Sequence, residues 1–200
     1  MASFPIDFDA FHTGALTMQD AADTLTVAQL QQATELSVTR MLAHIADCTD
    51  ADVRFVALDP DAAEGVTNAE GDVLGWTLRH IIAHTTATAE ASIFAAGELA
   101  RGVVLQGIGR YETPWETLMT IEHCRQRLRE SQRMRLASLA AWPSQPHLAN
   151  RYSPFPGAEP LNAKGIVVLG LEHDATHQHQ LAAIARQINT YGHCSIETSY

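Results

Sequence analysis

Two histidines near the end of the chain, His173 and His177, are spaced so that together they could bind one metal ion. They lie in the stretch LEHDATHQHQLAAIARQINTY, residues 171–191, whose pattern predicts a helix. At about 100° per residue, a separation of four brings a side chain back to the same helical face, one turn along. Two imidazoles on one face can hold a transition metal, but a stable site needs a further ligand.

A second pair with the same spacing, His80 and His84, is the candidate source of that ligand. In a helical bundle, metal sites are built from inward side chains on facing helices. Three histidines with an open fourth position form the arrangement of catalytic zinc, where water or substrate completes the coordination. The alternative is that both pairs are ordinary helix residues, since this spacing also arises by chance. His179 is only two residues from His177, so it points to another side of the helix. It and the histidines that stand alone are interpreted as non-ligands: His12, His44, His123, His147, His179 and His193.

Helical patterns predict two long helices in the first half of the chain. Residues 1–22 are expected to form a loosely structured lead-in with one short helix. A capping-box pattern at Thr26 begins a helix over about 26–47. Thr77 is a suitable N-cap for a second helix, which carries the His80/His84 pair and ends before Gly102. The many small residues of this second helix permit the close approach of a neighbouring helix.

Two further helices are predicted in the second half. Thr113 and the Pro-Trp-Glu that follows it indicate the start of a helix that reaches about Ala141. The last helix is expected over about 163–190. Five prolines exclude a helix over 142–161 and predict a long ordered loop, which at this length is often functional: Pro143, Pro146, Pro154, Pro156 and Pro160. Four helices and no convincing strand predict an all-α four-helix bundle in one domain spanning residues 1–200.

Composition and charge exclude several classes of protein. The net charge of -10 and the pI of about 5.3 argue against a nucleic-acid partner, whose binding requires clustered Lys and Arg. No run of 18 apolar residues and no signal-peptide pattern is present, so neither a membrane span nor secretion is expected. Three widely spaced cysteines fit a reducing compartment. We therefore expect a cytoplasmic protein that acts on a small-molecule substrate.

At two places the sequence resembles the DinB/YfiT-like metalloenzymes. The stretch WTLRHIIAHTTATAEA is similar to the family's second-helix motif, in which a Trp lies eight residues before a metal-binding His. Here these residues are Trp76 and His84. The stretch HDATHQHQLAAI is similar to the last-helix motif, in which His-x-x-x-His is followed by Gln and an aliphatic residue, here Gln180 and Leu181. The resemblance covers about residues 24–191 and implies the DinB-like bundle.

The resemblance also implies that His84, His173 and His177 bind a divalent metal. The sequence departs from the family at His80, where members often have Glu. His80 is then either a fourth ligand or a group beside the ligands that faces the substrate. We favour the second, because two pairs from two helices must converge closely to complete a tetrahedron. Imidazoles bind zinc, nickel, copper and iron, so the sequence leaves the metal open, with zinc and nickel favoured.

The resemblance implies a broad range of possible activities. Members resemble transferases and isomerases that use a low-molecular-weight thiol such as mycothiol, bacillithiol or glutathione, and others resemble metal-dependent hydrolases. A metal lowers the pKa of a bound thiol or water, which suits either reaction. We expect a thiol-dependent enzyme, with a hydrolase, a non-catalytic metal- or ligand-binding stress-related module and a helical scaffold as alternatives.

Two further expectations concern what the protein binds. Arg151 and Tyr152, in the Pro-rich loop, are candidates to bind substrate or an anionic thiol, although they could also be ordinary loop residues. The small-residue face of the second helix and the family resemblance together predict a homodimer, because a twofold dimer would bury one such face on each partner.

Overall fold

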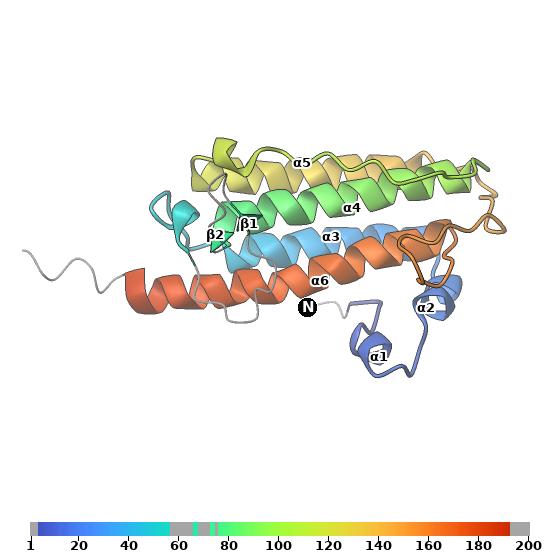
Figure 1. Ribbon diagram of the computed structural model, residues 1–200, viewed down its shortest axis with the longest axis horizontal. Helices are drawn as coiled ribbons and strands as arrows, with labels where there is room; N and C mark the ends of the chain where they lie inside the picture. The colour runs from blue at the N-terminus through green and yellow to red at the C-terminus, as the bar shows by residue number, and fades with distance from the viewer. Residues whose placement is uncertain (1–3, 57–65, 68–72, 75, 193–200) are drawn as a thin grey trace, which may run out of the picture.

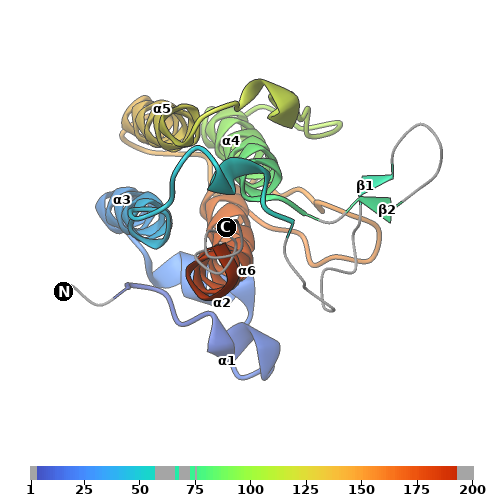
Figure 2. The ribbon, with the colours of Figure 1, turned by 90° about the vertical axis from the view of Figure 1, so that its left-hand side faces the viewer.

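Four long helices form the body of the protein in a computed structural model that describes residues 4–56, 66–67, 73–74 and 76–192. They are α3 (Val27–His44), α4 (Leu78–Ala100), α5 (Ile121–Ala140) and α6 (Ala163–Gln187). Figure 1 shows them side by side, and Figure 2 looks along them. The predicted all-α fold is confirmed. No described helix has both the length and the apolar character needed to cross a membrane.

The four helices are arranged so that α4 and α6 each have two neighbours. The helix α4 packs against α5 and α6, and α3 packs against the same two helices on the other side (Figure 2). Figure 1 shows that α4 and α5 run in the same direction, although they follow each other in the chain. The connection over 101–120 must therefore return along the length of the bundle, and this return brings it past the middle of α4.

Short elements complete the described part of the chain. Two helices precede the bundle, and α2 packs against α6, so the lead-in is more ordered than the single short helix that the sequence predicts. A two-stranded antiparallel pair lies between α3 and α4. The short elements are α1 (Asp9–His12), α2 (Met18–Thr24), η1 (Asp52–Arg54), β1 (Val66–Thr67), β2 (Val73–Leu74), η2 (Trp115–Thr117) and η3 (Ile188–Gly192).

Side-chain caps fix where the long helices begin. Thr26 accepts a hydrogen bond from the backbone N–H of Gln29, and the Gln29 side chain accepts one from the backbone of Thr26, so the predicted capping box is present. Thr77 caps α4 as the sequence indicates, through the N–H of His80 at 3.3 Å. Asn162 caps α6. Each cap sets the first helical residue, and the helical period then places residues three and four apart on the same face of α4 and α6.

The predicted start of the third helix is wrong. The signal at Thr113 is followed only by the single turn η2, and α5 begins at Ile121 with Thr120 as its N-cap. Leu118 interrupts the two, since its φ of -80° and ψ of 78° lie outside the helical region. The turn η2 still has a use at the site, because Trp115 packs beside His80, with ring centroids 5.5 Å apart.

The interior of the bundle has two apolar clusters separated by a polar layer. One cluster includes Leu30, Leu99 and Ile166, and the other includes Ile81 and Leu181. Between these levels each helix carries buried or half-buried polar side chains: Thr34, Ser37, His84, Thr85, Thr86, Glu90, Ser131, Arg135, His173, Asp174, His177 and Gln178. Buried polar groups are costly unless they are paired, so this layer points to function or to a structural network.

The small residues of α4 serve packing within the chain. Gly170 on α6 approaches α4 so closely that a Cβ atom there would lie 2.9 Å from the Cβ of Ser92. Gly97 on α4 faces Ser138 on α5 in the same way. Since these residues are used inside one molecule, they do not by themselves argue for a dimer, and the homodimer stays a prediction.

Candidate metal centre

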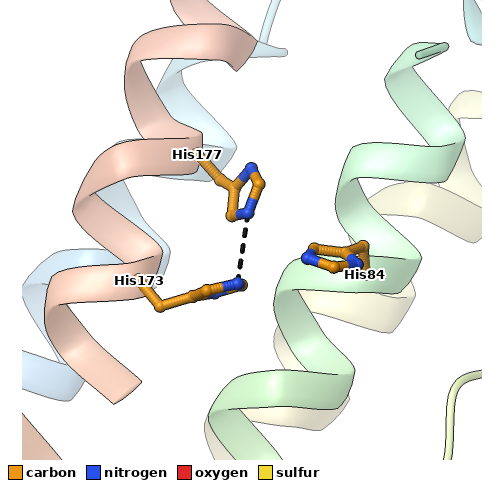
Figure 3. Close-up of side chains that lie close together, drawn as sticks. All are labelled: His84, His173 and His177. Carbon is orange, nitrogen blue, oxygen red and sulfur yellow. Dashed lines mark hydrogen bonds between the residues drawn. The ribbon is translucent and has the colours of Figure 1, made fainter. Parts of the chain in front are cut away.

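The side chains of His84, His173 and His177 meet between α4 and α6. Each offers one ring nitrogen, and these three atoms all lie within 4.8 Å of one another. The Nε2 atoms of His173 and His177 are 3.2 Å apart, and Figure 3 shows the ring of His84 facing them from the opposite helix. Nitrogens bound at about 2.1 Å to a tetrahedral metal lie about 3.4 Å apart. The cluster therefore fits a metal ion after small side-chain shifts.

Local sequence and close helix packing together produce this geometry. The i, i+4 spacing places His173 and His177 on one face of α6, one turn apart. Gly170, one turn before His173, lets α6 approach α4 until their backbones are close, which brings His84 within reach. A larger side chain at Gly170 would separate the two helices and move the imidazoles apart.

Neighbouring groups orient two of the imidazoles. The Oε1 atom of Gln180 lies 2.6 Å from Nδ1 of His177, and because a carbonyl oxygen only accepts, Nδ1 carries the hydrogen. The lone pair of His177 is then on Nε2, which faces Nε2 of His173 at 3.2 Å. On His84, Nδ1 accepts from Nη2 of Arg110 at 3.0 Å, because a guanidinium only donates, so Nε2 carries the hydrogen in this arrangement. A carboxylate oxygen of Glu112 lies 3.7 Å from the same Nδ1. A shift of this contact from Arg110 to Glu112 would let Nδ1 donate and give Nε2 the lone pair that a metal requires.

Burial keeps two of these histidines neutral. It lowers the pKa of His84 to about 3, with the nearby His177 and Arg110 adding to the effect. Burial, with His177 and His84, lowers the pKa of His173 to about 3 as well. Near pH 7 both rings are therefore unprotonated, which is the form that binds a metal.

This shift predicts that the metal-free protein is destabilised by mild acid. Between the folded pKa of about 3 and the ordinary value of 6.5, the unfolded chain binds more protons at His84 and His173, so stability falls as pH drops below 6.5. From pH 7.5 to 5.0 we expect each histidine to contribute a loss of about 2 kcal/mol. Urea unfolding at both pH values, with a chelator present, measures the loss. His84→Gln should lose about 2 kcal/mol less than the wild type over this interval. An equal loss in both proteins would contradict the prediction.

His80 lies beside the three-histidine cluster but is not part of it. Its ring stacks on Trp76, with centroids 4.4 Å apart and planes at 10°. Trp76 in turn packs against His84 and His177, at 4.9 and 5.6 Å between centroids. His80 thus reaches the cluster through the indole of Trp76, and its role as a non-ligand stays a prediction.

The two loop residues proposed from sequence lie elsewhere. Arg151 donates to the carbonyl of Pro160 at 3.2 Å, and the backbone of Tyr152 pairs with that of Leu161. Tyr152 also packs against the apolar core. Within the described part of the chain, no contact links Arg151 or Tyr152 to the three histidines, so their role in binding stays a prediction.

Arg110 is a cationic residue that the structure places at the cluster and that was not predicted from the sequence. It contacts Nδ1 and the carbonyl oxygen of His84, donates to Thr88 at 3.1 Å, and is paired with Glu112. Arg110 lies in the connection that returns along the bundle from α4 to α5. The sequence shows no sign of this return, because the parallel orientation of α4 and α5 cannot be read from helical patterns.

A cavity of about 610 Å³ opens beside His173. Its walls come from α4 and α6 and from three segments outside the bundle: the lead-in, the connection with Arg110, and the Pro-rich loop. The Pro-rich loop contributes Pro154 and Phe155, which follow closely after the residues proposed from sequence. A cavity of this size beside convergent polar groups is typical of a small-molecule site.

Comparison with known proteins supports the resemblance found in the sequence. The family model described as the DinB superfamily matches residues 10–181, a range that includes all three histidines. No curated protein and no solved structure matches the chain.

Proposed function

Because the chain belongs to the DinB superfamily, we propose that it is a metal-dependent enzyme whose metal is held by His84, His173 and His177. The observation that carries the proposal is the convergence of three imidazole nitrogens within 4.8 Å of one another beside a cavity. Three protein ligands leave room for a fourth from solvent or substrate, which is the arrangement of catalytic rather than structural sites.

We propose further that the reaction is thiol-dependent transfer or isomerisation. A divalent metal at this centre, with zinc or nickel favoured, would lower the pKa of a coordinated thiol or water. The bound group could then act as a nucleophile at neutral pH. The residues of the chain have separate tasks: Gln180 fixes the ring of His177, Arg110 contacts the ring of His84, and Trp76 packs against both rings. The low-molecular-weight thiol itself is a proposal that rests on the family resemblance.

Metal analysis of protein purified without a His tag tests the proposal. We expect about one divalent metal per chain. A screen with mycothiol, bacillithiol and glutathione against electrophilic substrates should then give turnover that His84→Ala abolishes. Turnover of an ester without any thiol would favour the hydrolase, and bound metal without either activity would favour the non-catalytic module. A tag-free protein that contains and binds no metal would contradict the proposal.

Gln180 should matter for metal affinity although it is not a ligand. Gln180→Leu removes the acceptor of the Nδ1 hydrogen of His177, so the ring is free to rotate, and we expect metal affinity to fall about 10- to 100-fold. Competition with a chromophoric chelator measures the affinity. Gln180→Glu is the control, because its carboxylate still accepts that hydrogen bond. Equal affinities for the Leu and Glu variants would show that the contact has no such role.

A homodimer in the cytoplasm remains our expectation from the sequence. Sedimentation at micromolar concentration measures the oligomeric state directly, and a monomer alone would remove the dimer from the proposal.

A further inference from the structure

The cavity beside His173 has a predominantly apolar wall. The apolar residues come from the lead-in, α4, the connection with Arg110, the Pro-rich loop and α6: Phe11, Met18, Ala91, Ile108, Phe155 and Leu169. These segments are spread over residues 11–173, so this wall exists only in the folded chain. Such a surface favours a ligand that gains by leaving water.

The charged groups of the lining already have partners within the protein. Arg110 is paired with Glu112 and donates to Thr88, so its charge is already balanced within the protein. Glu172 faces His12, with 3.3 Å between Nε2 and the carboxylate oxygen. An anionic ligand would have to compete with Glu112 for Arg110, whereas an uncharged ligand leaves both pairs intact.

From this lining we infer that the substrate carries an uncharged apolar group, aliphatic or aromatic, which this cavity binds with the reacting end towards His173. The inference deepens the proposed function and rests on it, because His173 is one of the proposed metal ligands. It also gives the Pro-rich loop a task, since Phe155 lines the cavity while the residue remains 58% exposed. Such a residue can move aside as a ligand enters.

Binding of a matched pair of fluorescent probes tests the inference on the intact protein. N-phenyl-1-naphthylamine is uncharged, and 1-anilinonaphthalene-8-sulfonate has the same aromatic skeleton with one negative charge. We expect the uncharged probe to bind at one site per chain, and the sulfonate to bind at least about tenfold more weakly. Tighter binding of the sulfonate would overturn the inference, because it would mean that a free cation lines the site.

A charge placed in the apolar wall of the cavity should weaken binding of the uncharged probe. Ile108→Glu puts a carboxylate into the cavity, and we expect the affinity for the uncharged probe to fall by at least about tenfold. Val104→Glu is the matched control, because it makes a similar change in the same connection at a side chain that is 71% exposed and outside this cavity. Phe94→Ala, at an exposed aromatic of α4 outside the cavity, controls for surface binding. Equal losses in Ile108→Glu and Val104→Glu, or no loss in Ile108→Glu, would overturn the inference.

Metal content measured on the same proteins separates this inference from the proposed function. His177→Ala should lose the metal yet keep the uncharged probe, because His177 does not line the cavity. If the wild type binds no metal, but the uncharged probe binds more tightly than the sulfonate and Ile108→Glu weakens its binding, the proposed function fails and the apolar site stands. If metal is bound and the probe series fails, the proposed function stands and the substrate class is wrong.

Discussion

His177→Ala should abolish stable metal binding. Its Nε2 faces that of His173 at 3.2 Å, so its removal leaves two imidazoles, and two imidazoles hold a divalent metal weakly. We expect metal affinity to fall by several orders of magnitude and any metal-dependent activity to disappear with it. The fold should persist, because the two apolar clusters above and below the polar layer are unchanged. In excess metal, stability should fall towards that of the metal-free protein.

His179→Ala is the control for this change. His179 is two residues further along α6 and exposed, and its side chain lines a different cavity with His44 and Arg40. It should therefore retain both metal and activity. The measurement is bound metal per chain for the two purified variants, side by side. Equal retention in both would mean that the histidines of α6 are ordinary helix residues and that the metal centre is wrong.

Arg135→Met should cause the largest loss of stability among single changes in the polar layer. Arg135 on α5 is 3% exposed and lies 2.8 Å from the carboxylate of Asp174 on α6, which is 0% exposed and also accepts from Ser37 on α3 at 2.8 Å. Removal of the guanidinium leaves a buried carboxylate without its cation, at a cost of about 3–5 kcal/mol. That is a large part of the total stability of an ordinary domain, about 5–15 kcal/mol. Urea unfolding of the metal-free protein measures the change.

The chain offers two controls for this prediction. Arg133→Met is the same substitution two residues away, at an exposed ion pair with Glu130, and should leave the unfolding midpoint unchanged. The double variant Arg135→Met with Asp174→Leu removes both charges and should recover most of the loss, because no buried charge remains unpaired. A double variant as unstable as Arg135→Met alone would show that packing, and not the unpaired carboxylate, causes the loss.

The buried polar contacts of α6 also explain how it presents the two histidines proposed as ligands. Asp174 and Gln178 directly follow His173 and His177, and they lie on the adjacent face of the helix. Both are fixed to the opposite side of the bundle, since Gln178 donates to Ser37 at 3.2 Å and Ser37 donates to Asp174. These hydrogen bonds fix the orientation of α6 about its own axis, so that His173 and His177 point towards α4.

The sequence by itself determined the local features of the site. Helix starts depend on nearby residues, so the caps at Thr26 and Thr77 could be predicted from composition and spacing. The phase of a regular helix is equally local, which is why His173 and His177 were expected on one face. The failure at Thr113 has a local reason too: a capping signal requires only one turn, and the backbone at Leu118 ended the helix after that turn.

Only the tertiary structure decided which distant groups meet at the three histidines. Arg110 reaches His84 because α4 and α5 are parallel and their connection must return along the bundle (Figure 1). Phe155 lines the cavity, while the nearby Arg151 bonds within its own loop. These positions depend on the direction and packing of whole helices. A helical pattern specifies the buried face of each helix, but many arrangements of four helices satisfy the same set of faces, and the contacts between them select one.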